Sequence, residues 1–274
     1  MHNAFRWCLC AGVVTAVSCA VNDPYVNTQA TESFRLSEWE LVWMDDFSRD
    51  ELDATKWTRC ERGGADWQNT KSDDPRLLKI EDGVLHLLGI VNDDTDSDPS
   101  PYLTAGITGR GKFEFTYGKV RIRARLQGAQ GAWPALWMLG AEGGWPGCGE
   151  IDLMERLNFD NRVYQTVHSE YTLHIDKTNT PRRAKATRIN PDDWNIYGCI
   201  WDADQIVFTI NDEPTFTYPR VPEKGDEQWP FDRPFFFKFS MQIGGEWVNR
   251  FAPTNPDHYP AGMEVDWVRV YQRK

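Results

Sequence analysis

Short apolar segments, separated by clusters of Gly, Asn, Asp and Pro, recur from Trp39 onward and constrain the fold more than any other feature of the sequence. No long stretch repeats apolar residues with the 3.6-residue period of a helix. Segments of this length and spacing are typical of a β-rich domain. We therefore predict an all-β sandwich of two stacked antiparallel sheets, built as a single domain over residues 38–274. The expected strands are Trp39–Met44, Val84–Leu88, Phe113–Phe115, Lys119–Leu126, Ala135–Leu139, Val163–His168, Ile206–Ile210, Phe235–Met241 and Met263–Tyr271.

The segment Lys119–Leu126 (KVRIRARL) alternates strictly between charged and apolar residues. A period of two predicts a strand with one buried face and one face in water. Two polar stretches, 91–101 and 172–192, interrupt the strands and are predicted to be long loops. Long loops in a compact domain are often binding loops.

The N-terminus has the pattern of an export signal. Arg6 is the only firm positive charge before the apolar run Trp7–Val17, which is too short to cross a bilayer. The run ends in Ala-Val-Ser-Cys19 and resembles a bacterial lipoprotein signal, in which the cysteine is lipidated; an ordinary cleaved signal with a chance cysteine is the alternative. We predict a lipoprotein signal peptide at 1–19, a flexible tether at 20–37 and a cell-envelope or secreted location, with membrane contact only through the lipid on Cys19.

Composition excludes some functions. The 274-residue chain has a net charge of −11, so a basic surface for nucleic acid is absent. Thirteen tryptophans are more than packing alone requires, and some are expected to stack on sugars. Beyond the signal, Cys60, Cys148 and Cys199 fit no metal motif. A disulfide between two of them would suit an exported protein, and the sequence does not say which two.

Three acids on one segment, Gly149–Glu155 (GEIDLME), are the strongest chemical signal. Glu150 and Asp152 alternate with apolar residues as on a strand, but the third acid stands at Glu155 and not at 154. A β-bulge at Leu153–Met154 adds one residue and returns Glu155 to the face of the other two. Aromatic and glycine-rich segments precede the triplet and suggest an aromatic cleft.

The spacing of the two glutamates favours the retaining mechanism of glycoside hydrolysis over the inverting one. Five residues at roughly 3.3 Å each, less about one step for the bulge, allow a carboxyl separation on the order of 5–6 Å. Retaining glycosidases need about 5–5.5 Å between nucleophile and acid/base, and inverting ones about 6.5–9.5 Å. Asp152 between them would help to keep one glutamate ionised and the other protonated. A Ca²⁺ site and an inert acidic surface are the alternative interpretations of the triplet.

These residues resemble glycoside hydrolase family 16, whose signature E-x-D-x-x-E lies on a bulged strand of a β-jelly-roll. The likeness covers roughly 38–273, with the segments in the family's order: WPALWMLG (133–140), GEIDLME (149–155), YQTVHSEY (164–171), YGCIWDADQIVFTIND (197–212), FKFSMQIGGEW (237–247) and MEVDWVRVYQ (263–272). The resemblance implies a concanavalin-like jelly-roll sandwich with a concave substrate cleft.

The resemblance also implies residue roles. Glu150 would be the nucleophile, Glu155 the general acid/base and Asp152 their support, with no cofactor needed for catalysis. The residues implied to bind substrate in the cleft are Trp133, Trp137, Trp145, His168, Trp67, Gln242 and Trp247. Family members often carry one structural Ca²⁺ on the convex side, and the matching positions here are Asp46, Gly83 and Asp266, of which Asp46 stands for the usual glutamate. Oxygen ligands suit Ca²⁺.

The sequence departs from laminarinase-like members in residues 62–83, which lack most of the stretch that forms glycone subsites. GGADWQN and the continuation of the signature into Arg156, Leu157 and Asn158 look more like members that attack host O-glycans. Few basic residues occur in the recognised cleft segments, which disfavours heavily sulfated substrates, although each of four arginines is a candidate to bind them: Arg110, Arg156, Arg182 and Arg183.

We therefore expect a monomeric, retaining endo-β-glycosidase that acts on a polysaccharide or glycan chain. β-Galactosidic linkages of mucin-type O-glycans or poly-N-acetyllactosamine are favoured over the alternative, the β-1,3(4)-glucans. A non-catalytic glycan-binding lipoprotein is the alternative of another class.

Overall fold

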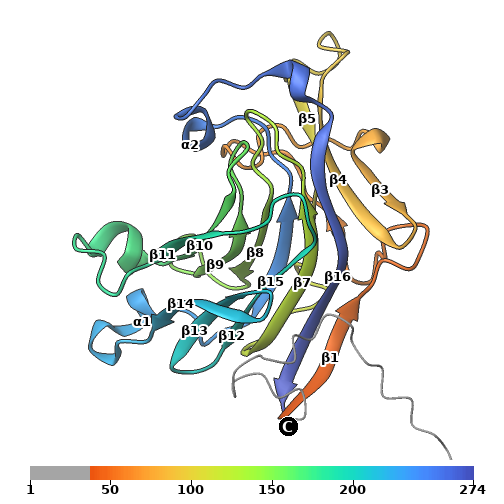
Figure 1. Ribbon diagram of the computed structural model, residues 1–274. Coiled ribbons are helices and arrows are strands. Elements are labelled where there is room, and N and C mark those ends of the chain that lie inside the picture. The colour runs from red at the N-terminus through yellow and green to blue at the C-terminus, as the bar shows by residue number, and fades with distance from the viewer. Residues whose placement is uncertain (1–37) are drawn as a thin grey trace, which may run out of the picture.

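The computed structural model describes residues 38–274, so the predicted signal peptide, the tether at 20–37 and Cys19 lie outside the described residues. Two antiparallel sheets are stacked face to face (Figure 1), which confirms the all-β sandwich. The helices in this part of the chain are single turns, and none of them has the length and apolar character to cross a membrane. They are η3 (Pro75–Leu77), η4 (a π-helix, Tyr171–Ile175), η5 (Pro222–Lys224), α1 (Gly225–Gln228), α2 (Glu246–Asn249) and η6 (Pro256–His258).

The larger sheet has nine strands in the order β14-β13-β12-β7-β16-β4-β3, with β1 paired to β16 and β5 to β4. Its strands are β1 (Trp39–Asp45), β3 (Leu78–Glu81), β4 (Val84–Val91), β5 (Tyr102–Thr104), β7 (Gly118–Leu126), β12 (Asn195–Trp201), β13 (Gln205–Ile210), β14 (Glu213–Pro219) and β16 (Ala261–Arg273).

The smaller sheet has seven strands in the order β11-β10-β9-β8-β15-β6-β2. Its strands are β2 (Thr58–Arg59), β6 (Gly106–Thr108), β8 (Ala135–Gly140), β9 (Glu150–Glu155), β10 (Arg162–His168), β11 (Ala184–Arg188) and β15 (Phe235–Ser240). The acid triplet lies on β9, near the middle of this sheet.

The core lies between the two sheets. Ile151 and Phe237 of the smaller sheet and Ile122 and Val268 of the larger one are all at most 1% exposed and belong to one continuous cluster. Because side chains of a strand alternate between its faces, the intervening residues of β8, β9, β10 and β15 point away from the core. That second face of the smaller sheet carries the candidate site.

Strand β7 alternates as predicted, but the first half of its outer face is not in water. Lys119 and Arg121 are each 1% exposed. Indole rings of β1 and β16 lie near them: the Lys119 ammonium is 5.9 Å from the Trp39 ring and the Arg121 guanidinium is 5.3 Å from the Trp267 ring. The expectation of one wet face is therefore wrong for the first half of this strand.

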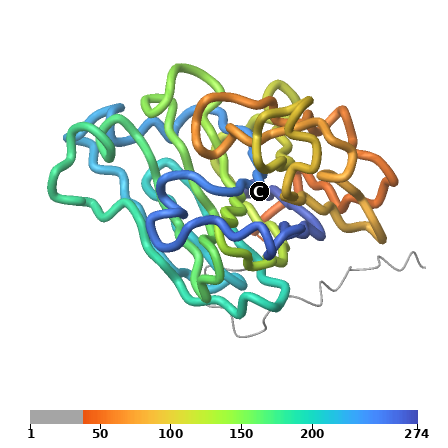
Figure 2. Tube along the Cα trace, turned by 90° about the horizontal axis from the view of Figure 1, so that it is seen from above, coloured from red at the N-terminus to blue at the C-terminus, as the bar shows by residue number. Residues whose placement is uncertain are grey.

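Two predicted segments also differ from the structure. The stretch 172–192 is not a simple loop, since it contains most of η4 and the edge strand β11, which pairs with β10. Phe113–Phe115 forms no strand and contributes one isolated bridge, from Phe115 to Phe235. Viewed from above, the segment around 171–183 lies on one side of the molecule and the orange-to-yellow N-terminal third on the other (Figure 2).

Candidate active site

A β-bulge in β9 sets the geometry of the site. On one side, Asp152 is opposite Trp137 and Met154 is opposite Leu136, so Leu153 has no partner in the register. The register of β9 with β10 shifts at the same place, between Tyr164 and Thr166. The extra residue turns Glu155 to the face of Glu150 and Asp152, which confirms the bulge expected from the sequence.

The three acids define three rows across the exposed face of the smaller sheet. Glu150 lies between His168 of β10 and Leu139 of β8. Asp152 lies between Thr166 and Trp137, and Glu155 between Tyr164 and Ala135. Gly149 precedes Glu150 and has a φ of +82°. A Cβ at this position would lie 2.9 Å from the rings of Pro230 and Phe235. A glycine is therefore required just before Glu150.

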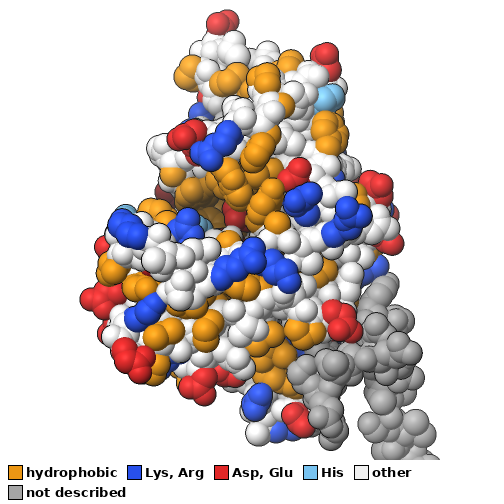
Figure 3. All heavy atoms as spheres, turned by 60° about the vertical axis from the view of Figure 1, so that its left-hand side comes forward, with side chains coloured by type: hydrophobic (Ala, Val, Ile, Leu, Met, Phe, Trp, Pro, Cys, Tyr) orange, Lys and Arg blue, Asp and Glu red, His pale blue; other side chains and the backbone are white. Residues whose placement is uncertain are grey.

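A cleft of about 640 Å³ runs over these rows. The three acids and all seven residues predicted to bind substrate line it, including five tryptophans. Figure 3 shows this face of the molecule, where hydrophobic side chains gather around a hollow with acidic atoms in its depth. Trp145 is the most open of the tryptophans, at 57% exposed, whereas Trp137 is 6% exposed and forms the floor.

Two indole N–H groups hold the two glutamates. Trp145 Nε1 donates to Glu150 Oε2 at 2.7 Å, and Trp133 Nε1 donates to Glu155 Oε1 at 3.0 Å. A donor directed at a carboxylate favours its ionised form and fixes its orientation.

The protonation of the three carboxyl groups is governed by burial. Burial and the charge of Asp152 raise the pKa of Glu150 to about 8. Burial also raises the pKa of Asp152, while burial and then the Asp152 charge raise the pKa of Glu155 well above its usual range. Such closely placed carboxyl groups cannot all be ionised near neutral pH. Glu155 is only 8% exposed, so burial opposes its ionisation strongly.

His168 stands beside the acids. Its Nε2 lies 3.3 Å from Asp152 Oδ2 and 3.8 Å from Glu150 Oε1. A positive charge on this ring favours the ionised form of both carboxyl groups, which is the direction in which it acts on the pKa of Glu150. Among residues 38–274, these three side chains are the group whose ligand atoms, all within 4.8 Å of one another, could hold a metal ion.

The sequence of this chain also matches a known protein family. Residues 77–269 match the family model described as Glycosyl hydrolases family 16. The chain belongs to glycosyl hydrolase family 16. This confirms the resemblance, and with it the jelly-roll sandwich and the class of enzyme, an O-glycosyl hydrolase.

Two relatives and one solved structure are similar to this chain. The keratan-sulfate endo-1,4-beta-galactosidase of Sphingobacterium multivorum is 38% identical over 86% of this chain, which spans 56% of that protein. The beta-glucanase of Rhodothermus marinus is 32% identical over 88% of this chain and 87% of its own length. The X-ray structure of the laminarinase from Rhodothermus marinus superposes with a TM-score of 0.76 at 31% identity, covering 86% of this chain and 98% of that one.

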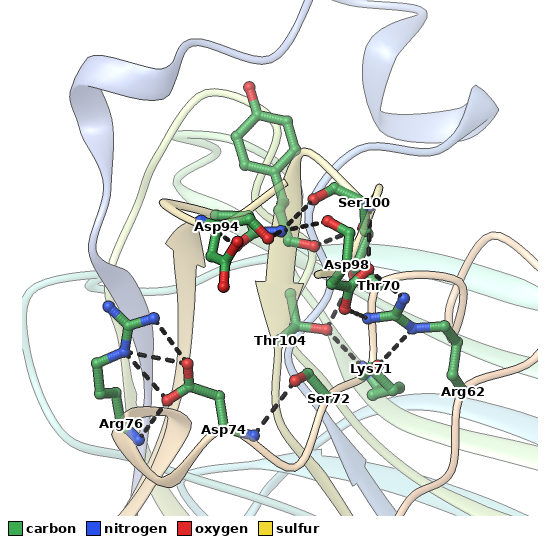
Figure 4. Close-up of polar contacts among 12 residues, drawn as sticks. Arg62, Thr70, Lys71, Ser72, Asp74, Arg76, Asp94, Asp98, Ser100 and Thr104 are labelled. Atoms are coloured by element: carbon green, nitrogen blue, oxygen red, sulfur yellow. Dashed lines mark hydrogen bonds and ion pairs between the residues drawn. The ribbon is translucent and has the colours of Figure 1, made fainter. Parts of the chain in front are cut away.

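Side-chain hydrogen bonds hold the first part of the segment 62–83, where the sequence departs from the laminarinase-like pattern. Arg62 donates through Nη1 and Nη2 to the two carboxylate oxygens of Asp98, at 2.7 and 2.6 Å, and through Nε to the carbonyl of Lys71 at 2.7 Å (Figure 4). Asn92 Nδ2 donates to the carbonyls of Asp98 and Ser100, which keeps the partner loop 92–101 compact. This frame carries Trp67 to the cleft.

Gln242 has a supporting position. It is 1% exposed, and its amide nitrogen donates to Asn69 Oδ1 at 2.9 Å while its amide oxygen accepts from Thr70 at 3.0 Å. These contacts join the loop that carries Trp67 to the segment after β15. Gln242 lines the cleft, as predicted, with its polar atoms engaged by the protein.

Sequence reasoning missed two lining or flanking residues, Tyr164 and Lys238, whereas Arg183 was among the arginines considered for sulfated substrates. Tyr164 and Arg183 line the cleft, and Lys238 lies beside it with its ammonium 4.1 Å from the Trp67 ring and 4.9 Å from the Trp137 ring. The alternation of Phe235, Phe237 and Phe239 toward the core could have placed Lys238 on the cleft face. The cleft therefore has more positive charge than the recognised segments suggested.

Two of the predicted calcium ligands, Asp46 and Gly83, lie close together, but the three residues do not form a ready site. The backbone oxygen of Asp46 is 4.0 Å from a Cβ built on Gly83. The Asp266 carboxylate, however, is bonded to the Arg123 guanidinium, which already balances its charge. A cation would have to compete with Arg123, so these residues do not fit Ca²⁺ in this arrangement. The calcium site stays a prediction, which a rise in Tm with added Ca²⁺ would support.

Cys60, Cys148 and Cys199 are buried free thiols. The disulfide that the sequence left open is not formed among the described residues.

Proposed function

We propose that this protein is a retaining endo-β-glycosidase in which Glu150 is the nucleophile and Glu155 the general acid/base. The observation that carries this proposal is the bulge at Leu153, because it turns both glutamates into one cleft lined by five tryptophans. A nucleophile and an acid on one strand are what the double-displacement reaction requires.

The reaction proceeds in two steps. The Glu150 carboxylate attacks the anomeric carbon while the bond to the leaving oxygen breaks, and Glu155 gives its proton to that oxygen. Water then loses a proton to Glu155 and attacks the same carbon, which releases Glu150. Two inversions restore the β configuration.

Asp152 and His168 are proposed to support the pair. Burial raises the pKa of Glu155, and the charge of Asp152, which stands between the glutamates, raises it further, so that this carboxyl is protonated before catalysis. His168, 3.3 Å from Asp152, favours the ionised form on the Glu150 side of the cleft. Both residues act on both glutamates, because the Asp152 charge raises and the His168 charge lowers the pKa of each.

For the substrate, we propose β-galactosidic linkages in chains of alternating galactose and N-acetylglucosamine, such as mucin-type O-glycans or poly-N-acetyllactosamine. The relative at 38% identity, named as a keratan-sulfate endo-1,4-beta-galactosidase, supports this class over the relative at 32%, named as a beta-glucanase. Arg183 in the cleft and Lys238 beside it are compatible with acidic substituents on such chains.

An endo-β-1,3(4)-glucanase is the second candidate. The specific observation in its favour is the close superposition on a laminarinase along almost the whole of that chain. Reducing-end release from laminarin, mixed-linkage glucan, agarose, keratan sulfate and mucin, with mass spectrometry of the products, distinguishes the two. Release from laminarin alone would contradict the galactosidic proposal.

The Glu150→Gln variant tests the reaction itself. Gln keeps the shape of the side chain and removes the nucleophilic carboxylate. Turnover of the polymer that the wild type cleaves should therefore fall at least about a thousandfold. Glu213→Gln, on β14, is the matched control and should keep full activity. Retained turnover in Glu150→Gln would contradict Glu150 as the nucleophile. No release from any polymer by the wild type would favour the non-catalytic glycan-binding protein.

We also propose that the protein is a cell-envelope lipoprotein anchored through Cys19, on the sequence evidence alone. Cys19→Ala should abolish incorporation of labelled palmitate and move the protein to the soluble fraction. Membrane attachment that survives this change would contradict the anchor.

A further inference from the structure

A second hollow adjoins the cleft on the Glu155 side. It has a volume of about 590 Å³. Tyr164 lines both hollows and is paired directly opposite Glu155 in the register of β9 and β10. The two spaces therefore share a wall, and the shared residue stands next to the proposed acid/base.

A line of aromatic rings leads from the catalytic cleft into this hollow. Trp133, which donates to Glu155, is in edge contact with Trp247 at 5.4 Å between ring centroids. Trp247 is in edge contact with Tyr164 at 5.3 Å, and the Tyr164 hydroxyl donates to Asp160 Oδ2 at 3.0 Å. Asp160 itself lines the second hollow, so the wall is continuous and its position is fixed by hydrogen bonding.

Two phenylalanines stand open on the far part of the hollow. Phe159 is 56% exposed and Phe251 is 63% exposed, although both rings are large and apolar. The remaining lining residues are mostly polar, with the carboxylate of Asp160 and the guanidinium of Arg162 among them. Exposed flat rings next to hydrogen-bonding groups suit a pyranose, which presents apolar CH faces and a rim of hydroxyls.

Phe159 has a defined place. Its ring is in edge contact with His258 at 5.1 Å. The backbone at Gly128 passes so close that a Cβ there would lie 2.8 Å from Phe159 Cδ1. The ring is therefore held against neighbouring segments while much of its surface stays in water.

We infer that this hollow binds the distal sugars on the leaving-group side of the substrate, with Phe159 and Phe251 as stacking platforms. The inference rests on the proposed function, in which Glu155 protonates the leaving oxygen. Tyr164 is opposite Glu155 and lines both hollows, so the second hollow is the space next to that oxygen on this side of the cleft. The occupant is the reducing-end part of the same glycan that is cleaved.

The test compares two substrates that differ on the leaving-group side. One is the polymer that the wild type cleaves, chosen from laminarin and keratan sulfate; the other is an aryl glycoside of the same sugar, whose leaving group is p-nitrophenol. For Phe159→Ala and Phe251→Ala, the ratio of kcat/KM for the polymer to that for the aryl glycoside should fall about three- to tenfold per ring. The fall should come from a higher KM for the polymer.

Leu41→Ala is the control, because Leu41 is an exposed apolar residue, 44% exposed, on β1 of the other sheet. It should leave the ratio unchanged. Gly128→Ala provides a second variant that displaces the Phe159 ring without removing it, and it should lower the ratio in the same direction.

The outcomes separate this inference from the proposed function. An unchanged ratio in both phenylalanine variants, with polymer cleavage intact, overturns the inference alone. An equal fall for both substrates also overturns it, because the rings would then act on the structure of the catalytic cleft. Absence of polymer cleavage by the wild type would contradict the proposed function itself. Binding of long and short oligosaccharides to Glu150→Gln by calorimetry then decides the inference: a loss of affinity for long chains only, on removal of the rings, supports it, and no such loss overturns it.

Discussion

The indole nitrogen of Trp145 lies 2.7 Å from Oε2 of Glu150, in a side chain that is otherwise 57% exposed. Little packing depends on this ring, yet it gives the proposed nucleophile a hydrogen bond that favours the charged carboxylate. Trp133 and Glu155 form the corresponding pair deeper in the cleft. The two contacts differ in exposure, and so do the expected consequences of removing them.

Trp145→Phe should keep the ring and remove the N–H donor. The ionised form of Glu150 then loses stabilisation, so the acidic limb of the pH profile of kcat/KM should move up by at least about half a pH unit. Below that limb kcat/KM should fall roughly three- to tenfold. Trp194→Phe, at an indole that stacks on Arg123 on the other sheet, is the control. An unmoved acidic limb would contradict a role for this hydrogen bond.

The wild-type pH profile follows from the raised pKa values. Activity should rise as Glu150 loses its proton, whose pKa is raised to about 8, and fall again as Glu155 loses its own at higher pH. Because the groups titrate together, the two limbs report values for the cluster. We expect the acidic limb well above pH 4.5. An acidic limb at pH 4–5 would show that the free enzyme ionises its carboxyl groups without the cost of burial.

Stability should depend on pH for the same reason. The folded-state pKa of Glu150 lies above its unfolded value, so its contribution to stability is greatest below about pH 4.5 and is lost as pH rises through about 8. Glu150→Gln removes the charge that must otherwise be buried. Its Tm should exceed that of the wild type by about 2–6 °C at pH 8.5 and by less at pH 5. A difference that is larger at pH 5 would reverse the sign of the argument.

The buried ion pair of Arg121 and Asp212 should matter for stability alone. Both side chains are at most 2% exposed, and Arg121 donates to the two oxygens of Asp212 at 3.0 and 2.8 Å. Asp212→Ala removes the buried charge opposite Arg121, which costs about 3–5 kcal/mol. Urea unfolding should show this loss, with Asp204→Ala as an exposed control. A loss below 1 kcal/mol would mean that water reaches the guanidinium.

The clamp between Arg62 and Asp98 should act on substrate affinity. Partly exposed ion pairs contribute about 0–1 kcal/mol to stability, so Arg62→Ala should change Tm little. It should nevertheless raise KM for the polymer, because the frame that carries Trp67 into the cleft is loosened. Arg76, which pairs with Asp74 and Asp93, is a similar exposed pair, and Arg76→Ala is the control. Equal effects of the two variants on KM would argue against a specific clamp.

The acid triplet shows what sequence alone could predict. Glu155 breaks the period of two that Glu150 and Asp152 set, and this predicted the bulge. A strand that buries Ile151 and Leu153 can bring all three acids to one face only if it contains an extra residue. The tryptophans of the cleft followed from family resemblance, and all of them line it. These features depend on local periodicity and on motifs.

Other features depend on contacts between distant segments. The burial of Lys119 and Arg121 requires Trp39 and Trp267 from neighbouring strands, which the period of β7 does not reveal. Strand β11 (AKATR) has too few apolar residues to be recognised, and it forms because the edge of β10 offers hydrogen bonds. Such features become visible when the pairing of strands is known.

Chemical rescue by azide tests the central assignment most directly. Glu155→Ala leaves Glu150 to form the glycosyl-enzyme but lacks the acid and base, so azide should restore turnover of an activated aryl glycoside and give the β-glycosyl azide, identified by the anomeric coupling in its NMR spectrum. In Glu150→Ala, azide can replace only the nucleophile and should give the α-glycosyl azide. A β-azide from Glu150→Ala, or an α-azide from Glu155→Ala, would contradict the assigned roles.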